Sequence, residues 1–128
     1  MTHIERVLLV RHGQTDWNVD GRWQGVLPVG LNAQGWSQAR ALAASLRGRP
    51  IGAIYSSDLP RAFETATVVG SVMGLVPHTD IRLREFSLGV FQGLTREQIE
   101  DRYRTEWQAF RSDYWNYTVP QGESRRAL

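Results

Sequence analysis

The feature that most constrains the fold is the alternation of short apolar runs with helical segments. Strands are predicted at residues 6–10, 52–56 and, more weakly, 75–81, because these short runs carry β-branched residues and leucine next to turn-forming residues. Helices are predicted between the first and second runs and between the second and third. This alternation builds a parallel sheet covered by helices, so the sequence predicts an α/β fold.

The two helices between the strands have recognisable ends. The first is expected to begin after Asn32, a good N-cap, and to end before Gly48. Ser57 and Asp58 offer a cap for the second, which tolerates proline in its first turn and is expected to end at Gly74. Their predicted buried stripes are Trp36, Ala39, Ala43 and Leu46 in the first, and Ala62, Ala66, Val69 and Met73 in the second.

A third helix is predicted to open at Thr95. Gln98 follows three residues later and completes the pattern of a capping box. Helical spacing of apolar residues extends past Tyr103 toward Phe110, so one continuous helix is expected there. Residues 14–30 contain glycines and a proline without a sustained period, and are expected to form a loop.

Length and composition indicate one globular domain over residues 1–128. Hydrophobic residues make up 41% of the chain and charged residues 22%, values typical of globular proteins rather than of disordered or membrane proteins. The chain has no cysteine, which excludes disulfides, thiolate metal sites and a cysteine nucleophile. The first ten residues resemble neither a signal peptide nor a membrane span, so a cytoplasmic location is expected.

The basic residues favour a small anionic partner. The chain has fifteen basic residues and all are arginine, the side chain best suited to bidentate phosphate contacts. The arginines are scattered rather than clustered, so nucleic-acid binding is not expected.

Chemistry is predicted where the first strand ends. Residues 11–13 read Arg-His-Gly, and Asn18 follows shortly after. His12 can attack phosphorus when one ring nitrogen is unprotonated, and neighbouring arginines favour the neutral ring while they neutralise phosphate oxygens. A lone histidine is more often an ordinary loop residue, so the assignment depends on the surrounding pattern.

That pattern resembles the histidine phosphatases, the phosphoglycerate-mutase-like superfamily. Residues 9–18 (LVRHGQTDWN) are similar to the signature in which the histidine is phosphorylated, and residues 21–25 (GRWQG) are similar to the loop that follows it. The resemblance implies that His12 accepts the phosphoryl group and that Arg11 and Asn18 bind it. It also implies a three-layer αβα fold with a mostly parallel central sheet.

Two further motifs extend the resemblance. Residues 56–66 are similar to the segment whose arginine contacts the phosphoryl group, which assigns that role to Arg61. A helix's first turn also directs backbone donors toward an anion. Residues 83–86, with the glycine-containing stretch after them, resemble the segment that carries the general acid, which assigns that role to Glu85. A carboxylic acid partly desolvated beside Phe86 would protonate the leaving oxygen.

The chain departs from the family at one point. The family has a second histidine before a glycine on a later strand, and neither His3 nor His78 stands in that context, so both are expected to be structural or surface residues. Residues 122–124 (GES) resemble the segment upstream of the family's last helix and strand. The domain is therefore expected to be incomplete at its C-terminus, and a homodimer that covers the unpaired sheet edge is a hypothesis.

The resemblance implies a phosphomonoesterase that acts on small phosphorylated metabolites through a phosphohistidine. No cofactor is expected, and no metal either, because the three histidines have no ligand spacing. Two alternatives stay open: mutase-type phosphoryl transfer, which residues 86–93 favour less, and a phosphoester-binding scaffold without catalysis.

Overall fold

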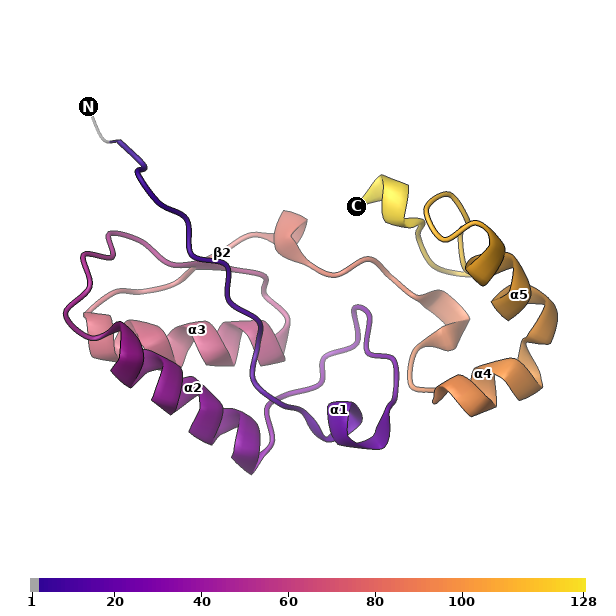
Figure 1. Ribbon diagram of the computed structural model, residues 1–128, viewed down its shortest axis with the longest axis horizontal. Helices are drawn as coiled ribbons and strands as arrows, with labels where there is room; N and C mark the ends of the chain where they lie inside the picture. The colour runs from indigo at the N-terminus through magenta and orange to yellow at the C-terminus, as the bar shows by residue number, and fades with distance from the viewer. Residues whose placement is uncertain (1–2) are drawn as a thin grey trace.

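The computed structural model describes residues 3–128 (Figure 1). In chain order its main elements are α1 (Asp16–Asp20), α2 (Ala33–Leu46), β1 (Tyr55–Ser56), α3 (Pro60–Met73), β2 (His78–Thr79), α4 (Arg96–Arg102) and α5 (Arg104–Ser112). Single turns of 3-10 helix lie at η1 (Ile81–Leu83), η2 (Gly89–Phe91) and η3 (Arg125–Ala127).

Strands β1 and β2 pair in parallel and confirm the α/β class. Tyr55 pairs with His78 and Ser56 with Thr79, and α3 makes the crossover between the strands. Two backbone hydrogen bonds extend this pairing. The His78 N–H donates to the Ile54 oxygen at 2.8 Å, and the Asp80 N–H donates to the Ser56 oxygen at 2.9 Å. Both strands lie within the predicted runs but are shorter.

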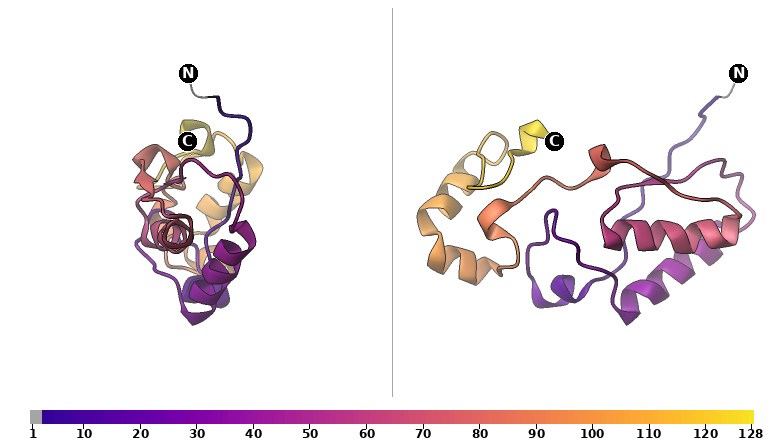
Figure 2. Two further views of the ribbon diagram at one scale, coloured as in Figure 1. Left: turned by 90° about the vertical axis from the view of Figure 1, so that its left-hand side faces the viewer. Right: turned by 180° about the vertical axis from the view of Figure 1, so that it is seen from behind.

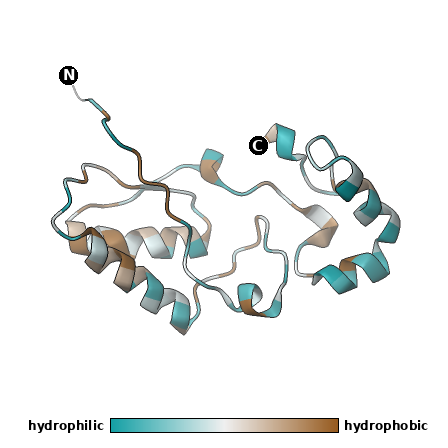
Figure 3. Ribbon diagram, viewed as in Figure 1, coloured by the Kyte–Doolittle hydropathy of each residue, from teal (hydrophilic) through white to brown (hydrophobic). Residues whose placement is uncertain are grey.

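The strand predicted at residues 6–10 does not form, and this prediction is wrong for the described chain. The side chains of Val7 and Leu9 are 72% and 93% exposed. No backbone hydrogen bond joins this segment to another described residue. A strand is stabilised by the ladder to its neighbour, and without that neighbour the backbone groups stay hydrated. Figure 3 shows the segment as a largely hydrophobic stretch that enters the fold from the N-terminus.

Helices α2 and α3 pack against each other over a small apolar core. Ala43, Leu46 and Val69 form its buried centre, which confirms the predicted stripes in outline. Asn32 caps α2 as predicted, with its Oδ1 accepting a hydrogen bond from Gly35 N at 2.8 Å. The predicted cap of α3 is wrong: Leu59 occupies the N-cap position without a side-chain bond.

A second, larger core is built by the C-terminal half. Its buried members are Phe86, Leu88, Phe91, Ile99, Trp107, Phe110 and Val119. Thr95 and Gln98 form the predicted capping box, but the helix breaks at Tyr103 into α4 and α5. The break lets Ile99 and Trp107 both face this core, although no single straight helix continues through them.

Helix α1 and the loop after it lie between two pairs of helices. In Figure 2 the pair α2–α3 and the pair α4–α5 occupy opposite ends of the molecule, with α1 and its following loop between them. Trp23 joins this loop to the larger core through edge-to-face contact with Trp107, at a centroid distance of 5.5 Å. Within residues 3–128, no helix is long and apolar enough to cross a membrane. A single domain over residues 1–128 stays a prediction.

Candidate active site

The structure brings the five predicted site residues together around one pocket. Its volume is about 560 Å³. Arg11 and His12 enter it from the N-terminal segment, and the other three come from α1, the first turn of α3 and the segment after η1. Those three are Asn18, Arg61 and Glu85.

The ring of His12 is oriented by its own backbone neighbour. Its Nδ1 lies 2.6 Å from the carbonyl oxygen of Gly13. A carbonyl oxygen only accepts, so Nδ1 carries the proton, and Nε2 of the neutral ring keeps the free lone pair. His12 is therefore held in the tautomer that presents Nε2 as a nucleophile.

The surroundings of His12 keep the ring neutral. Partial burial is the largest cause that lowers its pKa below the ordinary 6.5, and the positive charges of Arg61 and Arg11 lower it further. The bond to Gly13 and the charge of Glu85 act in the opposite direction, but the net pKa shift is downward. At neutral pH the ring is thus mostly unprotonated.

The His12 loop is fixed to α3 through Thr65. The backbone N–H of Gly13 donates to Thr65 Oγ1 at 3.1 Å, and this hydroxyl donates to the Arg61 carbonyl at 2.8 Å. Thr65 is 5% exposed. One buried hydroxyl therefore connects the His12 loop with the helical turn that carries Arg61.

The same loop packs against the start of α2 through two glycines. A Cβ placed on Gly13 would lie 2.5 Å from the Gly35 oxygen, and one placed on Gly35 would lie 2.1 Å from the Gln14 oxygen. The neighbouring atoms are backbone, which cannot move aside as a flexible side chain can. Glycine at both positions allows the close approach that positions His12.

Arg61 is a buried cation with only part of its donors used. It is 4% exposed, and its guanidinium donates to the carbonyls of Leu27 and Gly25, the former at 2.9 Å. Burial lowers its pKa from the ordinary value, which for arginine leaves the group charged. These bonds fix the guanidinium beside the pocket and leave further N–H groups for an anion.

Asn18 belongs to a short helix that the loop prediction for residues 14–30 missed. Helix α1 is capped by Thr15, whose backbone N–H donates to Asn18 Oδ1 at 2.9 Å. With that oxygen engaged, the amide NH₂ of Asn18 is the group available to the pocket. Five residues are too few to show helical periodicity, but the capping box Thr15–Asn18 was a usable signal.

Glu85 is exposed at the pocket rim, so the expected desolvation beside Phe86 is wrong for the described chain. Phe86 is 3% exposed and points instead into the larger core. Consecutive residues of an extended segment face opposite sides, which sends Phe86 inward and leaves the carboxylate of Glu85 toward the pocket.

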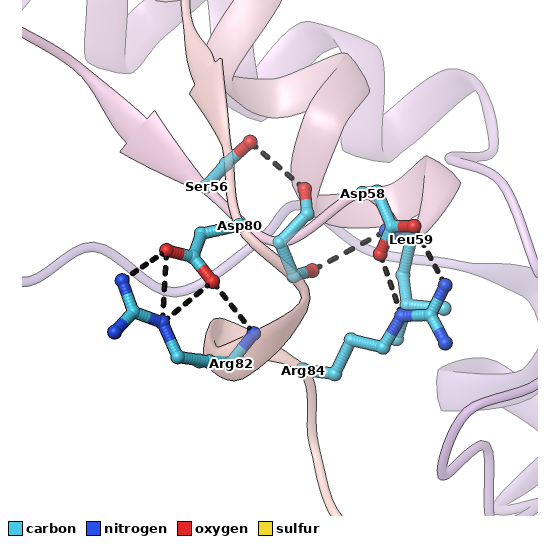
Figure 4. Close-up of polar contacts among 7 residues, drawn as sticks. Ser56, Asp58, Leu59, Asp80, Arg82 and Arg84 are labelled. Atoms are coloured by element: carbon cyan, nitrogen blue, oxygen red, sulfur yellow. Dashed lines mark hydrogen bonds and ion pairs between the residues drawn. The ribbon is translucent and has the colours of Figure 1, made fainter.

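The segment that carries Glu85 is attached to the start of α3 by an ion pair. Arg84 donates to both carboxylate oxygens of Asp58, each at 2.6 Å. This side-chain hydrogen bond lowers the pKa of Asp58. In Figure 4 the pair bridges two segments, whereas Arg82 and Asp80 pair within a single turn.

Several pocket residues were not predicted. Gln24 accepts a hydrogen bond from Thr15 Oγ1 at 2.7 Å, and Arg22 and Arg125 add two cations to the lining. Trp17 and Trp23 also line the pocket. His78 stacks on Tyr55 at a centroid distance of 5.1 Å and does not line it.

Within the described residues, no group of three histidine, aspartate or glutamate side chains is arranged to hold a metal ion.

Comparison with known proteins places this pocket in a family. Residues 7–128 match the model of the histidine phosphatase superfamily (branch 1). Over 120 residues the chain is 45% identical to glucosyl-3-phosphoglycerate phosphatase of Mycobacterium tuberculosis, covering 94% of this chain and 53% of that protein. It is 40% identical to phosphoglycerate mutase-like protein 4 of Arabidopsis thaliana, covering 91% of this chain and 51% of that one.

Solved structures agree. Mycobacterial glucosyl-3-phosphoglycerate phosphatase in complex with VO3 matches with a TM-score of 0.80 at 46% identity, over 89% of this chain and 54% of that chain. A putative alpha-ribazole-5'-P phosphatase from Escherichia coli matches with a TM-score of 0.87 at 29% identity, over 92% and 58%. The chain thus spans about half the length of the relatives it matches. On its sequence, its fold and the arrangement of its pocket, the chain belongs to the histidine phosphatase superfamily.

Proposed function

We propose that the chain is a phosphomonoesterase acting on small phosphorylated metabolites through a phosphohistidine at His12. The observation that carries the proposal is the 2.6 Å contact of His12 Nδ1 with the Gly13 carbonyl, which leaves Nε2 free in a pocket that also contains Arg11 and Arg61. The similarity to enzymes named as glucosyl-3-phosphoglycerate phosphatase and alpha-ribazole phosphatase supports a phosphorylated metabolite as substrate.

The proposed reaction has two displacements. In the first, the Nε2 lone pair of His12 forms a bond to phosphorus while the ester P–O bond breaks, and Glu85 gives its proton to the leaving oxygen. Arg11 and Arg61 stabilise charge on the phosphoryl oxygens, and the amide NH₂ of Asn18 donates to one of them. In the second, water attacks phosphorus, Glu85 takes up a proton, and the N–P bond breaks to release inorganic phosphate and neutral His12.

The same proposal includes a cytoplasmic location, since charged phosphorylated metabolites do not diffuse across membranes. The homodimer predicted from the sequence also stays a proposal, and the mass of the chain in solution tests it.

Mutase-type transfer is the second candidate. It is favoured by the 40% identity to a protein named as phosphoglycerate mutase-like. The two activities share the phosphohistidine and differ in the acceptor, which is water for a phosphatase and a hydroxyl of the bound metabolite for a mutase. Release of inorganic phosphate in stoichiometric amounts supports the phosphatase.

Hydrolysis of p-nitrophenyl phosphate by the chain, with a chelator present, tests the proposal. The expected result is turnover that is lost in His12→Ala and unaffected by the chelator. Phosphate binding without turnover, unchanged by the substitution, would instead support the non-catalytic scaffold.

A further inference from the structure

The loop after α1 contains a tight turn over residues 24–27. The Leu27 N–H donates to the Gln24 carbonyl at 3.0 Å and closes the turn. Gly25 has a φ of 53°, a left-handed conformation that favours glycine. The peptide group between Gly25 and Val26 lies in the middle of the turn, where the turn itself supplies no hydrogen-bond partner. Both polar groups of this peptide therefore need partners from elsewhere in the protein.

The two partners are Arg61 and Gln92. Arg61 donates to the Gly25 carbonyl of this peptide group, and also to the Leu27 carbonyl at 2.9 Å. On the other side, the Val26 N–H donates to Oε1 of Gln92 at 2.9 Å. Arg61 and Gln92 are thus bonded to opposite ends of one peptide group.

The same oxygen of Gln92 also contacts the segment that carries Glu85. The Leu88 N–H donates to it at 3.2 Å. Because both partners are N–H donors, the carboxamide must direct its oxygen rather than its NH₂ group toward them. The absence of a side chain at Gly25 allows this approach, since an added Cβ would lie 2.2 Å from the Gln92 oxygen. One side-chain oxygen therefore bridges the turn and the Glu85 segment.

Gln92 acts from outside the pocket. Gly25, Leu88 and Arg61 line the pocket, whereas Gln92 does not. Within the part of the chain that the structure describes, backbone hydrogen bonds join Trp23 to residues 93–94, but none joins the turn to them. The side chain of Gln92 provides that attachment instead, so any effect on a bound anion has to pass through the groups that Gln92 holds.

We propose that Gln92 is a positioning residue, which fixes the turn that aligns the Arg61 guanidinium with the phosphoryl group. The guanidinium is buried and bonded to two carbonyls of the turn, so its place in the pocket follows that of the turn. A peptide group is planar, so without its acceptor on Gln92 the group rotates as a unit and takes the Gly25 carbonyl with it. The inference rests on the proposed function, because it takes Arg61 as a ligand of the phosphoryl group.

A double-mutant cycle with inorganic phosphate as the probe tests this role. Gln92→Met keeps the length of the side chain but removes the acceptor, and Arg61→Gln removes the guanidinium. Phosphate affinity is measured from the His12 ring signals in NMR titrations, which also report weak binding. Gln92→Met is expected to weaken binding about tenfold where Arg61 is present. In the Arg61→Gln chain the same substitution is expected to change the affinity less than about twofold, because the group through which it acts is gone.

Further variants separate positioning from a general loss of stability. Gln92→Glu keeps an acceptor oxygen and is expected to retain more phosphate affinity than Gln92→Met. Gln92→Asn withdraws the same oxygen by one methylene group and is expected to weaken binding as Gln92→Met does, which provides a second variant if the methionine protein fails to fold. Ile99→Val destabilises the larger core without removing a hydrogen bond, and is expected to leave phosphate affinity unchanged.

The outcomes distinguish this inference from the proposed function. A loss in Gln92→Met that persists in the Arg61→Gln chain, or no loss at all, overturns the role of Gln92, while phosphate binding by the unsubstituted chain still supports the phosphate site. Coupled phosphate binding without hydrolysis of p-nitrophenyl phosphate supports the role of Gln92 and overturns the phosphatase. No phosphate binding by the unsubstituted chain overturns both.

Discussion

His12 and Thr65 are connected through the backbone of a single residue, Gly13. The Gly13 carbonyl accepts from His12 Nδ1 at 2.6 Å, and the Gly13 N–H donates to Thr65 Oγ1 at 3.1 Å. Thr65 in turn bonds to the carbonyl of Arg61. The orientation of the proposed nucleophile and the position of the phosphate-binding arginine thus depend on one short chain of hydrogen bonds.

Thr65→Val tests this connection. Valine has nearly the same shape but leaves the buried Gly13 N–H without an acceptor, so a loss of about 1–3 kcal/mol in the free energy of unfolding is expected, together with slower phosphoryl transfer. Thr67→Val is the matched control, because Thr67 makes the same bond to the carbonyl four residues earlier, at 2.8 Å, but is exposed. Chemical denaturation measures both variants, and equal effects would contradict the connection.

Gly35→Ala tests the close packing of the His12 loop on α2. Alanine favours helices, yet its Cβ would lie 2.1 Å from the Gln14 oxygen. A net destabilisation of about 1–3 kcal/mol is expected because backbone has to shift. Gly52→Ala is the control, since nothing lies within 4 Å of its added Cβ. A Gly35→Ala protein as stable and active as the control would show that the contact is unimportant.

The ionisation of His12 gives a pH-dependent prediction. Its pKa is lowered below 6.5, so the neutral, reactive ring becomes populated as pH rises through a value below 6.5, and the acid limb of kcat/KM should lie there. Arg61→Gln removes a charge that lowers this pKa, so the NMR titration of His12, assigned with His12→Ala, should move to higher pH. Arg40→Gln, an exposed change in α2, should leave it in place. A downward shift in Arg61→Gln would contradict the electrostatic account.

The bond between Asp58 and Arg84 gives a prediction about Glu85. Asp58→Asn removes a carboxylate that holds the Glu85 segment against α3, so the rate of phosphoryl transfer should fall several-fold with little change in Tm, because exposed ion pairs contribute little stability. Asp80→Asn breaks a pair confined to one turn and should leave the rate unchanged. Equal rates in the two variants would show that Asp58 does not position Glu85.

Much of the helical structure is predictable because its signals are local. The Asn32 cap, the glycine at position 74 and the Thr95–Gln98 box all act within a few residues, and all occur as expected. Residues 6–10 illustrate the opposite case, since a strand also needs a neighbour that no local pattern supplies. The break at Tyr103 likewise reflects packing on the larger core rather than a local breaker such as proline.

The candidate site likewise contains residues that local motifs predict and residues whose positions depend on distant contacts. Motif residues such as His12, Arg61 and Glu85 meet in one pocket as the resemblance implies, because each motif specifies residues at the ends of elements. Arg125 was not predicted as a site residue. Its position in the pocket depends on stacking with Tyr114 and Phe86, which lie in other parts of the sequence. No single motif carries that information.

The most direct test of the account is to trap the phosphorylated intermediate. The chain is mixed briefly with p-nitrophenyl phosphate, quenched in alkali and mapped by mass spectrometry, with His12→Ala and His78→Ala alongside. The proposed mechanism predicts one acid-labile phosphoryl group on His12, absent from His12→Ala and retained in His78→Ala. A phosphoryl group on any other residue, or turnover that persists in His12→Ala, would contradict it.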